Sequence, residues 1–283
     1  MIAFRQMGQQ IPLICIIGPT ASGKSARAVS EALERGGEVI SVDSRQVYRM
    51  LDIGTEKISP EEMQGVPHHL IDIRDPKDAY SAGDFVVDAE RLIMEIYKRG
   101  KIPILAGGTH FYFDALLNGI PGNTPMNEEL RAELEKRADE ELFAMIEEKD
   151  PERAAELDPK NRRRLIRALE IIEQHGKVPK RDAVSKYKPE WIVIDLPKEE
   201  LRERLDKRLA QAFERGLIEE VRRVRNYVGD TRLNEFGLEY KIVGEYLRGE
   251  RDEASLFPAL SSKLWHYARR QKAWMRKLIS CKP

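Results

Sequence analysis

Residues 18–25 are the part of this chain best suited to chemistry on phosphate groups. Their sequence, GPTASGKS, fits the phosphate-loop pattern G-x-x-x-x-G-K-[ST]. Glycines let the backbone wrap closely around an anion, so that successive N–H groups face the phosphate oxygens. Lys24 adds a positive charge, and the hydroxyl of Ser25 can ligate Mg²⁺. We therefore predict a diphosphate or polyphosphate site, with Mg²⁺ as cofactor, formed by Gly18, Pro19, Thr20, Ala21, Ser22, Gly23, Lys24 and Ser25.

The loop alone does not identify the phosphate compound. A kinase or another NTPase typically has an apolar strand that ends in a metal-supporting Asp. The apolar residues 102–106 are followed by Gly-Gly-Thr instead, and farther along the chain residues 191–195 form an apolar strand that ends in Asp. We interpret that residue, Asp195, as a cap of the next helix. This pattern disfavours the hypothesis that the chain is a small-molecule kinase or NTPase that binds a nucleotide (ATP), but that alternative stays open.

The elements that must position the loop alternate between short apolar strands and helices. Strands are expected at residues 11–17, 39–42 and 102–106, and helices at residues 23–35, 82–99 and 110–117. This alternation predicts an α/β fold with a parallel sheet of the P-loop NTPase type. Open α/β sheets bind ligands beyond the carboxyl ends of their strands. Asp43, which follows the second strand, is therefore expected at the same edge as the phosphate loop.

The character of the chain changes after Gly119. The stretch GIPGNTPMN leads into a long, highly charged segment with helical character, and a strand pattern returns at residues 191–196. We predict the first part of the α/β core in residues 1–118 and a helical insertion in residues 119–190. Residues 191–283 are expected to supply a return strand of the core and helical C-terminal elements.

The formal net charge is zero, with 48 basic and 48 acidic residues, but the basic residues are clustered. Residues 258–283 contain seven Lys or Arg and no acidic residue, and residues 160–181 contain eight basic and two acidic residues. Local basic stretches favour a polyanionic partner. Two distant cysteines, Cys15 and Cys281, form no disulfide framework, so we expect a reducing cytoplasm. We expect a monomer without a membrane span.

Four further motifs follow the phosphate loop: 43-DSRQVYRMLDIGT-55, 66-GVPHHLIDIRDP-76, 80-YSAGDF-85 and 107-GGTHFY-112. Together they closely resemble the bacterial type of the tRNA dimethylallyltransferase (tRNA isopentenyltransferase) family. The resemblance resumes at 161-NRRRLIRALEI-171 and 269-RRQKAWMRK-277. It implies transfer of a dimethylallyl group from dimethylallyl diphosphate to the exocyclic N6 amine of the adenosine 3′-adjacent to a tRNA anticodon. The phosphate loop would then hold the diphosphate leaving group.

The resemblance also implies roles for individual residues. Asp43 corresponds to the general base of the family and Thr109 to a residue that contacts the substrates. Taken alone, an Asp after a strand also caps turns, and a Thr after Gly-Gly also caps helices. Gln46 would read the flipped target base through its amide. The positions that match contacts to the anticodon stem-loop are Ser44, Arg45, Gln46, Arg131, Arg163, Arg164, Arg167, Arg269, Arg270, Gln271, Lys272, Trp274 and Arg276.

Helical spacing divides the C-terminal segment into two faces. The cationic face carries Trp265, Arg269, Lys272 and Arg276. The apolar face, which would dock on the protein, carries Leu264, Ala268, Gln271, Met275 and Leu278. A charged face of this kind is typical of a solvated helix as well as of a nucleic-acid-binding surface. The family resemblance favours contact with RNA.

The chain departs from the family pattern at 236-FGLEYK-241, where the family carries Q-A-I-G-Y-[KR], a motif that helps to bind tRNA. Tyr240 and Lys241 are retained, but the acidic Glu239 predicts a changed RNA affinity or tRNA choice. An adenylate isopentenyltransferase, which shares the loop and Asp43, stays open as a second function, although the basic stretches disfavour it. A P-loop kinase or NTPase and an RNA-binding protein without catalytic activity stay open as well.

Overall fold

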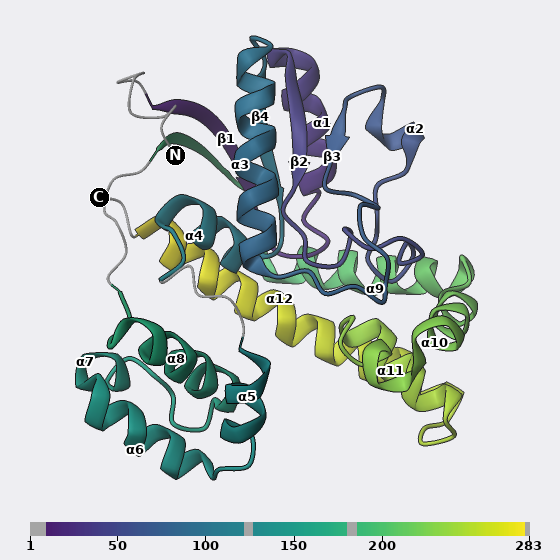
Figure 1. Cartoon of the computed structure of the whole chain (residues 1–283). Helices are drawn as coiled ribbons and strands as arrows, with labels where there is room; N and C mark the ends of the chain where they lie inside the picture. Colours follow the sequence, from purple (N-terminus) through teal and green to yellow (C-terminus); the bar gives the residue numbers. More distant parts are fainter. Residues whose placement is uncertain (1–9, 122–126, 180–185, 281–283) are drawn as a thin grey trace. The chain divides into compact units, whose positions relative to one another are not determined.

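The computed structural model describes residues 10–121, 127–179 and 186–280 and divides the chain into two units (Figure 1). The first unit contains the chain up to residue 117 and from residue 185 onward, and the second contains residues 118–184. Within the described ranges, none of the helices combines the length and the apolar character that a membrane crossing requires.

A five-stranded parallel sheet forms the centre of the first unit, as the alternation of strands and helices predicts. Its strand order is β3-β2-β4-β1-β5. The strands are β1 (Ile11–Ile17), β2 (Gly37–Ser41), β3 (His68–His69), β4 (Ile102–Gly107) and β5 (Tyr187–Val193). Leu13 and Cys15 of β1 belong to one core cluster, whereas Ile14 belongs to the other. Both faces of β1 are covered, which explains its almost uninterrupted apolar sequence.

Helices cover the two faces of the sheet unequally. On one face, α1 (Lys24–Arg35) packs through Ala28, Val29 and Ala32. On the other, α3 (Ala82–Lys98) shares a large core with the C-terminal helices. The remaining elements of this unit are α2 (Pro60–Met63), α4 (His110–Asn118), α9 (Lys198–Glu214), α10 (Leu217–Leu233), α11 (Leu238–Leu247), a 3-10 turn (Glu253–Ser255) and α12 (Leu256–Ser280).

The long helix α12, yellow in Figure 1, packs against α9 and α11. The residues predicted for its inner face are all buried, namely Leu264, Ala268, Gln271, Met275 and Leu278. The predicted apolar face is therefore confirmed, whereas the predicted cationic face is exposed only at Arg269 and Arg276, because Trp265 and Lys272 are partly buried.

The strand β5 begins earlier than the sequence predicts. The expected strand covers residues 191–196, whereas β5 spans Tyr187–Val193 and pairs with β1 along its whole length. Pro189 lies inside the strand. An edge strand tolerates proline because one row of its N–H groups faces away from the sheet. The predicted end of the insertion at residue 190 therefore lies too far along the chain, since the second unit ends at residue 184.

Asp195 does not cap α9, so our interpretation of this residue is wrong. The residue before α9 is Pro197, and it provides no side-chain hydrogen bond to the first turn. Asp195 instead forms an ion pair with Nζ of Lys272 on α12, at 2.5 Å. Two residues separate Asp195 from the first helical residue, which places its carboxylate too far back to serve as the cap.

The second unit is helical in its described part, as predicted. It contains α5 (Glu128–Leu134), α6 (Asp139–Lys149), α7 (Pro151–Ala154) and α8 (Arg162–His175). The residues predicted for the inner face of α8 (Leu165, Ile166 and Leu169) are buried in a core that also includes Leu142 and Ile146 of α6. The insertion therefore has a hydrophobic core of its own.

Candidate active site

Three loops meet at the carboxyl edge of the sheet. The phosphate loop follows β1, residues 42–46 follow β2, and the Gly-Gly-Thr turn follows β4. The register pairs Ile17 of β1 with Gly107 of β4 and Ser41 of β2 with Ala106 of β4. The three strands therefore end at the same level, at the edge where parallel α/β sheets bind their ligands.

The phosphate loop leads directly into α1. Gly23 precedes the helix with a φ of 89°, a left-handed conformation that glycine adopts without strain. Ala21 has a φ of 62°, which is strained for a residue with a Cβ and persists only where its surroundings hold it. Ser25 lies in the first turn of α1 and is exposed. Its hydroxyl is therefore accessible as a ligand for Mg²⁺ beside bound phosphates.

Lys24 lies within electrostatic reach of Asp43. Its Nζ donates a hydrogen bond to the carbonyl of Pro19 at 2.6 Å. Burial and, secondly, the positive charge of Arg208 lower the pKa of Lys24 to about 8, while the negative charge of Asp43 opposes them. A diphosphate at this position would add negative charge and favour the protonated ammonium.

Asp43 and Thr109 are joined through the backbone of Ser44. The Oδ1 of Asp43 accepts hydrogen bonds from the N–H groups of Arg45 at 2.8 Å and Gln46 at 3.3 Å. The hydroxyl oxygen of Thr109 accepts a hydrogen bond from the N–H of Ser44 at 3.1 Å. Asp43 therefore caps its own turn, and the same turn fixes its carboxylate beside the phosphate loop.

Gln46 joins this turn to the loop 51–57. Its Nε2 donates to the carbonyls of Thr55 at 3.2 Å and Glu56 at 3.3 Å, and its Oε1 accepts from the hydroxyl of Ser41 at 3.0 Å. The sequence predicts that this amide reads the flipped base. In the structure both ends of the amide are bonded within the protein, so Gln46 braces the loop.

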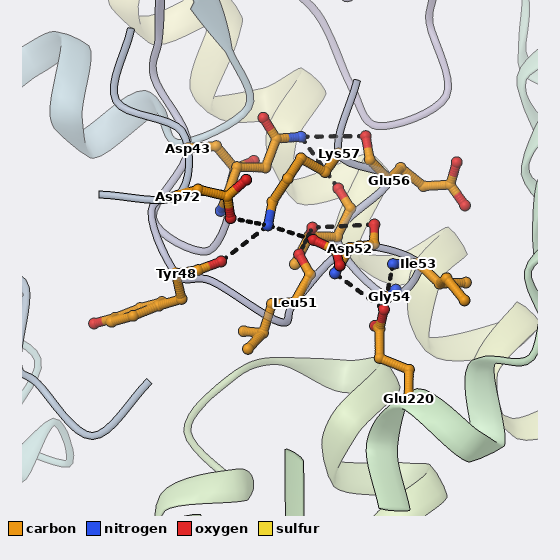
Figure 2. Close-up of polar contacts among 12 residues, drawn as sticks. Asp43, Tyr48, Leu51, Asp52, Ile53, Gly54, Glu56, Lys57, Asp72 and Glu220 are labelled. Carbon is orange, nitrogen blue, oxygen red and sulfur yellow. Dashed lines mark hydrogen bonds and ion pairs between the residues drawn. The ribbon is translucent and has the colours of Figure 1, made fainter. Parts of the chain in front are cut away.

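Glu220 on α10 holds the same loop from another side (Figure 2). Its carboxylate is 1% exposed and accepts hydrogen bonds from the N–H groups of Asp52 at 3.0 Å, Ile53 at 2.7 Å and Gly54 at 2.9 Å. The hydroxyl of Tyr240 donates to it at 2.8 Å. Tyr240, which is retained from the family motif at residues 236–241, is fully buried and contacts this carboxylate. Sequence reasoning misses Glu220 because its backbone partners lie 166 to 168 positions away.

Lys57 fixes the end of the loop 51–57 (Figure 2). Its Nζ donates to the carbonyl of Tyr48 at 2.9 Å and to the carboxylates of Asp52 and Asp72, each at 2.6 Å. The side chain of Lys57 is only 6% exposed. Two carboxylates and a carbonyl therefore replace most of the water that a buried ammonium loses.

Two charged residues near the phosphate loop were not predicted. Arg208 on α9 is half-buried, and in the described part of the chain it forms neither a hydrogen bond nor an ion pair. Its charge acts on both Lys24 and Glu239. Burial raises the pKa of the Glu239 carboxyl, and Arg208 opposes that effect. Glu239 thus lies close to the charges of the phosphate site, whereas the sequence singles it out only as a departure from a tRNA-binding motif. Arg208 is a cation available to a phosphate, and it belongs to no motif that would have revealed it.

The predicted tRNA contacts on α12 fall into two groups. Four are exposed: Arg269, Arg270, Trp274 and Arg276. Lys272 points inward and donates to the carbonyl of Leu196 at 2.9 Å. Gln271 is 5% exposed; its Oε1 accepts from the N–H of Thr20 at 2.8 Å, and its Nε2 donates to the carbonyl of Gly108 at 3.0 Å. Lys272 and Gln271 are therefore engaged inside the protein.

The predicted arginines of the second unit also form two groups. Arg163 and Arg164 are exposed, and neither has an ion pair in the described ranges. Arg131 donates from Nε and NH2 to the two oxygens of Glu170, each at 3.0 Å, and Arg167 donates to one of them at 3.2 Å. Glu170 is 1% exposed. Arg163 and Arg164 are thus the pair that the structure leaves accessible to a phosphate backbone.

Comparisons with known sequences place the chain in a family. The model of a family described as IPP transferase matches residues 46–278. A tRNA dimethylallyltransferase from Thermomicrobium roseum is 42% identical over 96% of this chain and 85% of that protein. A tRNA dimethylallyltransferase from Streptococcus pneumoniae is 41% identical over 93% of this chain and 89% of that protein.

Solved structures have the same fold. A full-length tRNA isopentenylpyrophosphate transferase from Bacillus halodurans matches with a TM-score of 0.70 and 37% identity, over 95% of this chain and 87% of that chain. A eukaryotic dimethylallyltransferase acting on tRNA matches with a TM-score of 0.83 and 29% identity, over 94% of this chain and 70% of that chain. By sequence and by fold, the chain belongs to the IPP transferase family.

Proposed function

We propose that the chain transfers a dimethylallyl group from dimethylallyl diphosphate to the N6 amine of the adenosine 3′-adjacent to a tRNA anticodon. The observation that carries this proposal is the placement of Lys24 and Asp43 at one edge of the sheet, close enough for their charges to interact. The transfer needs a cation for the diphosphate and a base for the amine proton. The relatives named tRNA dimethylallyltransferase support the same reaction.

On the donor side, the phosphate loop would hold the diphosphate through its backbone N–H groups and Lys24. As the amine nitrogen bonds to the first prenyl carbon, the bond from that carbon to the diphosphate oxygen breaks, and negative charge grows on the leaving group. Preorganised cations stabilise such charge, and Lys24 and Arg208, whose charges act on each other, would do so here. The Ser25 hydroxyl would hold Mg²⁺, which neutralises part of the diphosphate charge.

On the acceptor side, Asp43 would accept the proton that the N6 amine loses. The hydrogen bonds to this carboxylate from the described residues reach Oδ1, which leaves Oδ2 for the substrate. Thr109 accepts a hydrogen bond from Ser44, so its own O–H remains able to donate to a substrate oxygen. The target base must first leave its stack, which costs a few kcal/mol.

The tRNA would be held by exposed basic residues in each unit. On α12 these are Arg269, Arg270 and Arg276, with the aromatic Trp274 among them. In the second unit they are Arg163 and Arg164. Arginine contacts to phosphates give affinity and register without reading the sequence. We place the reaction in the cytoplasm, with the enzyme acting as a monomer.

The proposal is tested by incubating the purified protein with Mg²⁺ and radiolabelled dimethylallyl diphosphate. One sample receives unmodified tRNA with adenosine 3′ of the anticodon, and a parallel sample receives AMP. Label in tRNA, at N6 of that adenosine, is the expected result. Label in AMP alone would identify an adenylate isopentenyltransferase. Label in neither, with ATP hydrolysed in a third sample, would identify an NTPase.

A further inference from the structure

Gln271 connects two of the three loops at the candidate active site. Its Oε1 accepts the N–H of Thr20 in the phosphate loop at 2.8 Å. Its Nε2 donates to the carbonyl of Gly108, directly before Thr109, at 3.0 Å. A single side chain of α12 therefore binds the loop after β1 and the loop after β4 at the same time.

The chemistry of these contacts requires an amide. One partner is a donor and the other is an acceptor, and glutamine offers both groups at the end of one side chain. The Gly108 backbone comes so close that a Cβ there would lie 2.7 Å from the Gln271 Nε2. Gln271 is only 5% exposed, so little water is available to replace either hydrogen bond. Removing the amide would therefore leave buried backbone groups without partners.

The contact with Thr20 lies next to a strained residue. Ala21 follows Thr20 with a φ of 62°, and such a conformation persists only where surrounding contacts determine it. The bond from the Thr20 N–H to Gln271 is one contact that holds this part of the loop. The direction of the loop N–H groups toward a phosphate depends on this backbone conformation.

We propose that Gln271 is a positioning residue for the diphosphate donor: it holds the phosphate loop in its anion-binding conformation and fixes it against the loop of Thr109. This inference rests on the proposed function, in which the loop holds a diphosphate. It replaces the role of Gln271 as a tRNA contact. The neighbouring Arg270 is exposed and remains a proposed tRNA contact.

The test compares Gln271→Met with Ser261→Ala. Methionine keeps the volume of glutamine and removes both hydrogen bonds. Ser261 is a buried residue of the same helix whose hydroxyl donates to Asp206 at 2.6 Å, away from the phosphate loop. Calorimetry without tRNA would measure the affinity for inorganic pyrophosphate with Mg²⁺, and filter binding would measure tRNA affinity. Amide hydrogen exchange would report the protection of residues 18–25.

We expect Gln271→Met to weaken pyrophosphate binding about tenfold or more, as the loss of two hydrogen bonds implies. Amide hydrogen exchange in residues 18–25 should become faster. The affinity for tRNA should stay within about twofold of wild type, a change smaller than the contribution of one hydrogen bond. Ser261→Ala should leave pyrophosphate affinity and loop exchange unchanged. If Gln271→Met does not fold, Gln271→Glu takes its place, because it retains the acceptor for Thr20 and loses only the donor.

Three results would overturn the inference. Gln271→Met could bind pyrophosphate as the wild type does. It could lose tRNA affinity alone, which would return Gln271 to the tRNA surface. Ser261→Ala could show the same losses, which would make the effect a general property of α12. A wild-type protein that binds neither pyrophosphate nor dimethylallyl diphosphate would instead refute the proposed function, and the inference with it.

Discussion

Arg131 donates two parallel hydrogen bonds, from Nε and NH2, to the two oxygens of the Glu170 carboxylate, each at 3.0 Å. Glu170 is buried on α8. A bidentate arginine is among the strongest partners a carboxylate can have. In this structure Arg131 therefore neutralises an internal charge of the second unit, although its family match predicts a contact with tRNA.

We expect Arg131→Ala to destabilise the second unit by about 3–5 kcal/mol, because it leaves a buried carboxylate with an incomplete set of partners. Limited proteolysis and urea unfolding of the full chain would measure this loss. The double variant Arg131→Met with Glu170→Met should recover much of the stability, since it removes both charges and keeps the volume. A single Arg131→Ala variant as stable as the wild type would contradict this role.

Arg163 and Arg164 should behave in the opposite way. Both are exposed, so Arg163→Ala and Arg164→Ala should leave the unfolding free energy within about 0.5 kcal/mol of wild type. Each should weaken tRNA binding and lower the slope of log affinity against log salt by about one, as the loss of one phosphate contact implies. Filter binding at several KCl concentrations would check this. A slope equal to that of the wild type would mean that these arginines are only solvated.

Local signals explain why much of the fold can be predicted from the sequence. The apolar run of β1, the glycines of the phosphate loop and the helix up to Gly36 are each encoded within a few neighbouring residues. By contrast, β3 consists of His68 and His69 alone. A strand of two residues has no periodicity, and its pairing with β2 defines it.

The site is predictable where a motif is local and unpredictable where a partner is distant. Asp43 and Thr109 follow strands that carry recognisable signals, and the structure brings their loops together. Helical spacing correctly places Gln271 on the inner face of α12, but its partner Thr20 is 251 positions away. Charge patterning also cannot distinguish an arginine that faces tRNA from Arg131, because the neutralising acid lies 39 positions away.

Glu38 should make the stability of the sheet depend on acidic pH. Its buried carboxylate lies 2.8 Å from Nε2 of His69, 2.7 Å from NH2 of Arg99 and 3.3 Å from Nζ of Lys101. Burial alone would raise the pKa of Glu38, but the hydrogen bonds from these three residues outweigh it and lower the pKa from 4.5 to about 2. The ionised form is therefore the one that stabilises the fold.

Because the pKa in the folded state is depressed, the contribution of Glu38 is complete above pH 4.5 and is lost as the pH falls through 2. We expect Glu38→Gln to lower the unfolding free energy at pH 7 by about 1.5–3 kcal/mol, the usual range for hydrogen bonds to a charged group. The gap between variant and wild type should narrow below pH 4.5. Urea unfolding of both proteins from pH 7 to pH 2 would measure this difference in unfolding free energy. A difference that does not change with pH would exclude the ionised Glu38 carboxylate as its cause.

Glu220 and Tyr240 should differ in their effects on the loop 51–57. Glu220→Gln leaves one acceptor for three backbone N–H groups, so we expect a loss of about 2–3 kcal/mol. Tyr240→Phe removes only one hydroxyl donor and should cost about 1 kcal/mol. Urea unfolding and hydrogen exchange of residues 52–54 would measure both. Equal losses in the two variants would mean that Glu220 stabilises the fold mainly through its hydrogen bond with the Tyr240 hydroxyl, rather than through the backbone N–H groups of the loop.

Asp43→Asn separates the two roles of Asp43, because the amide retains an oxygen for the N–H groups of Arg45 and Gln46 but cannot accept the amine proton. We expect the rate of prenyl transfer to fall by about 10²–10⁴-fold, the usual contribution of a general base. Affinity for tRNA and the melting temperature should stay close to those of the wild type. Asp43→Ala, which also removes the turn cap, should lose stability as well as rate. Single-turnover transfer with labelled donor, measured beside tRNA binding, would compare the two variants. An Asp43→Asn variant that transfers the prenyl group within tenfold of the wild-type rate would exclude Asp43 as the general base. Its remaining role would then be to cap the turn.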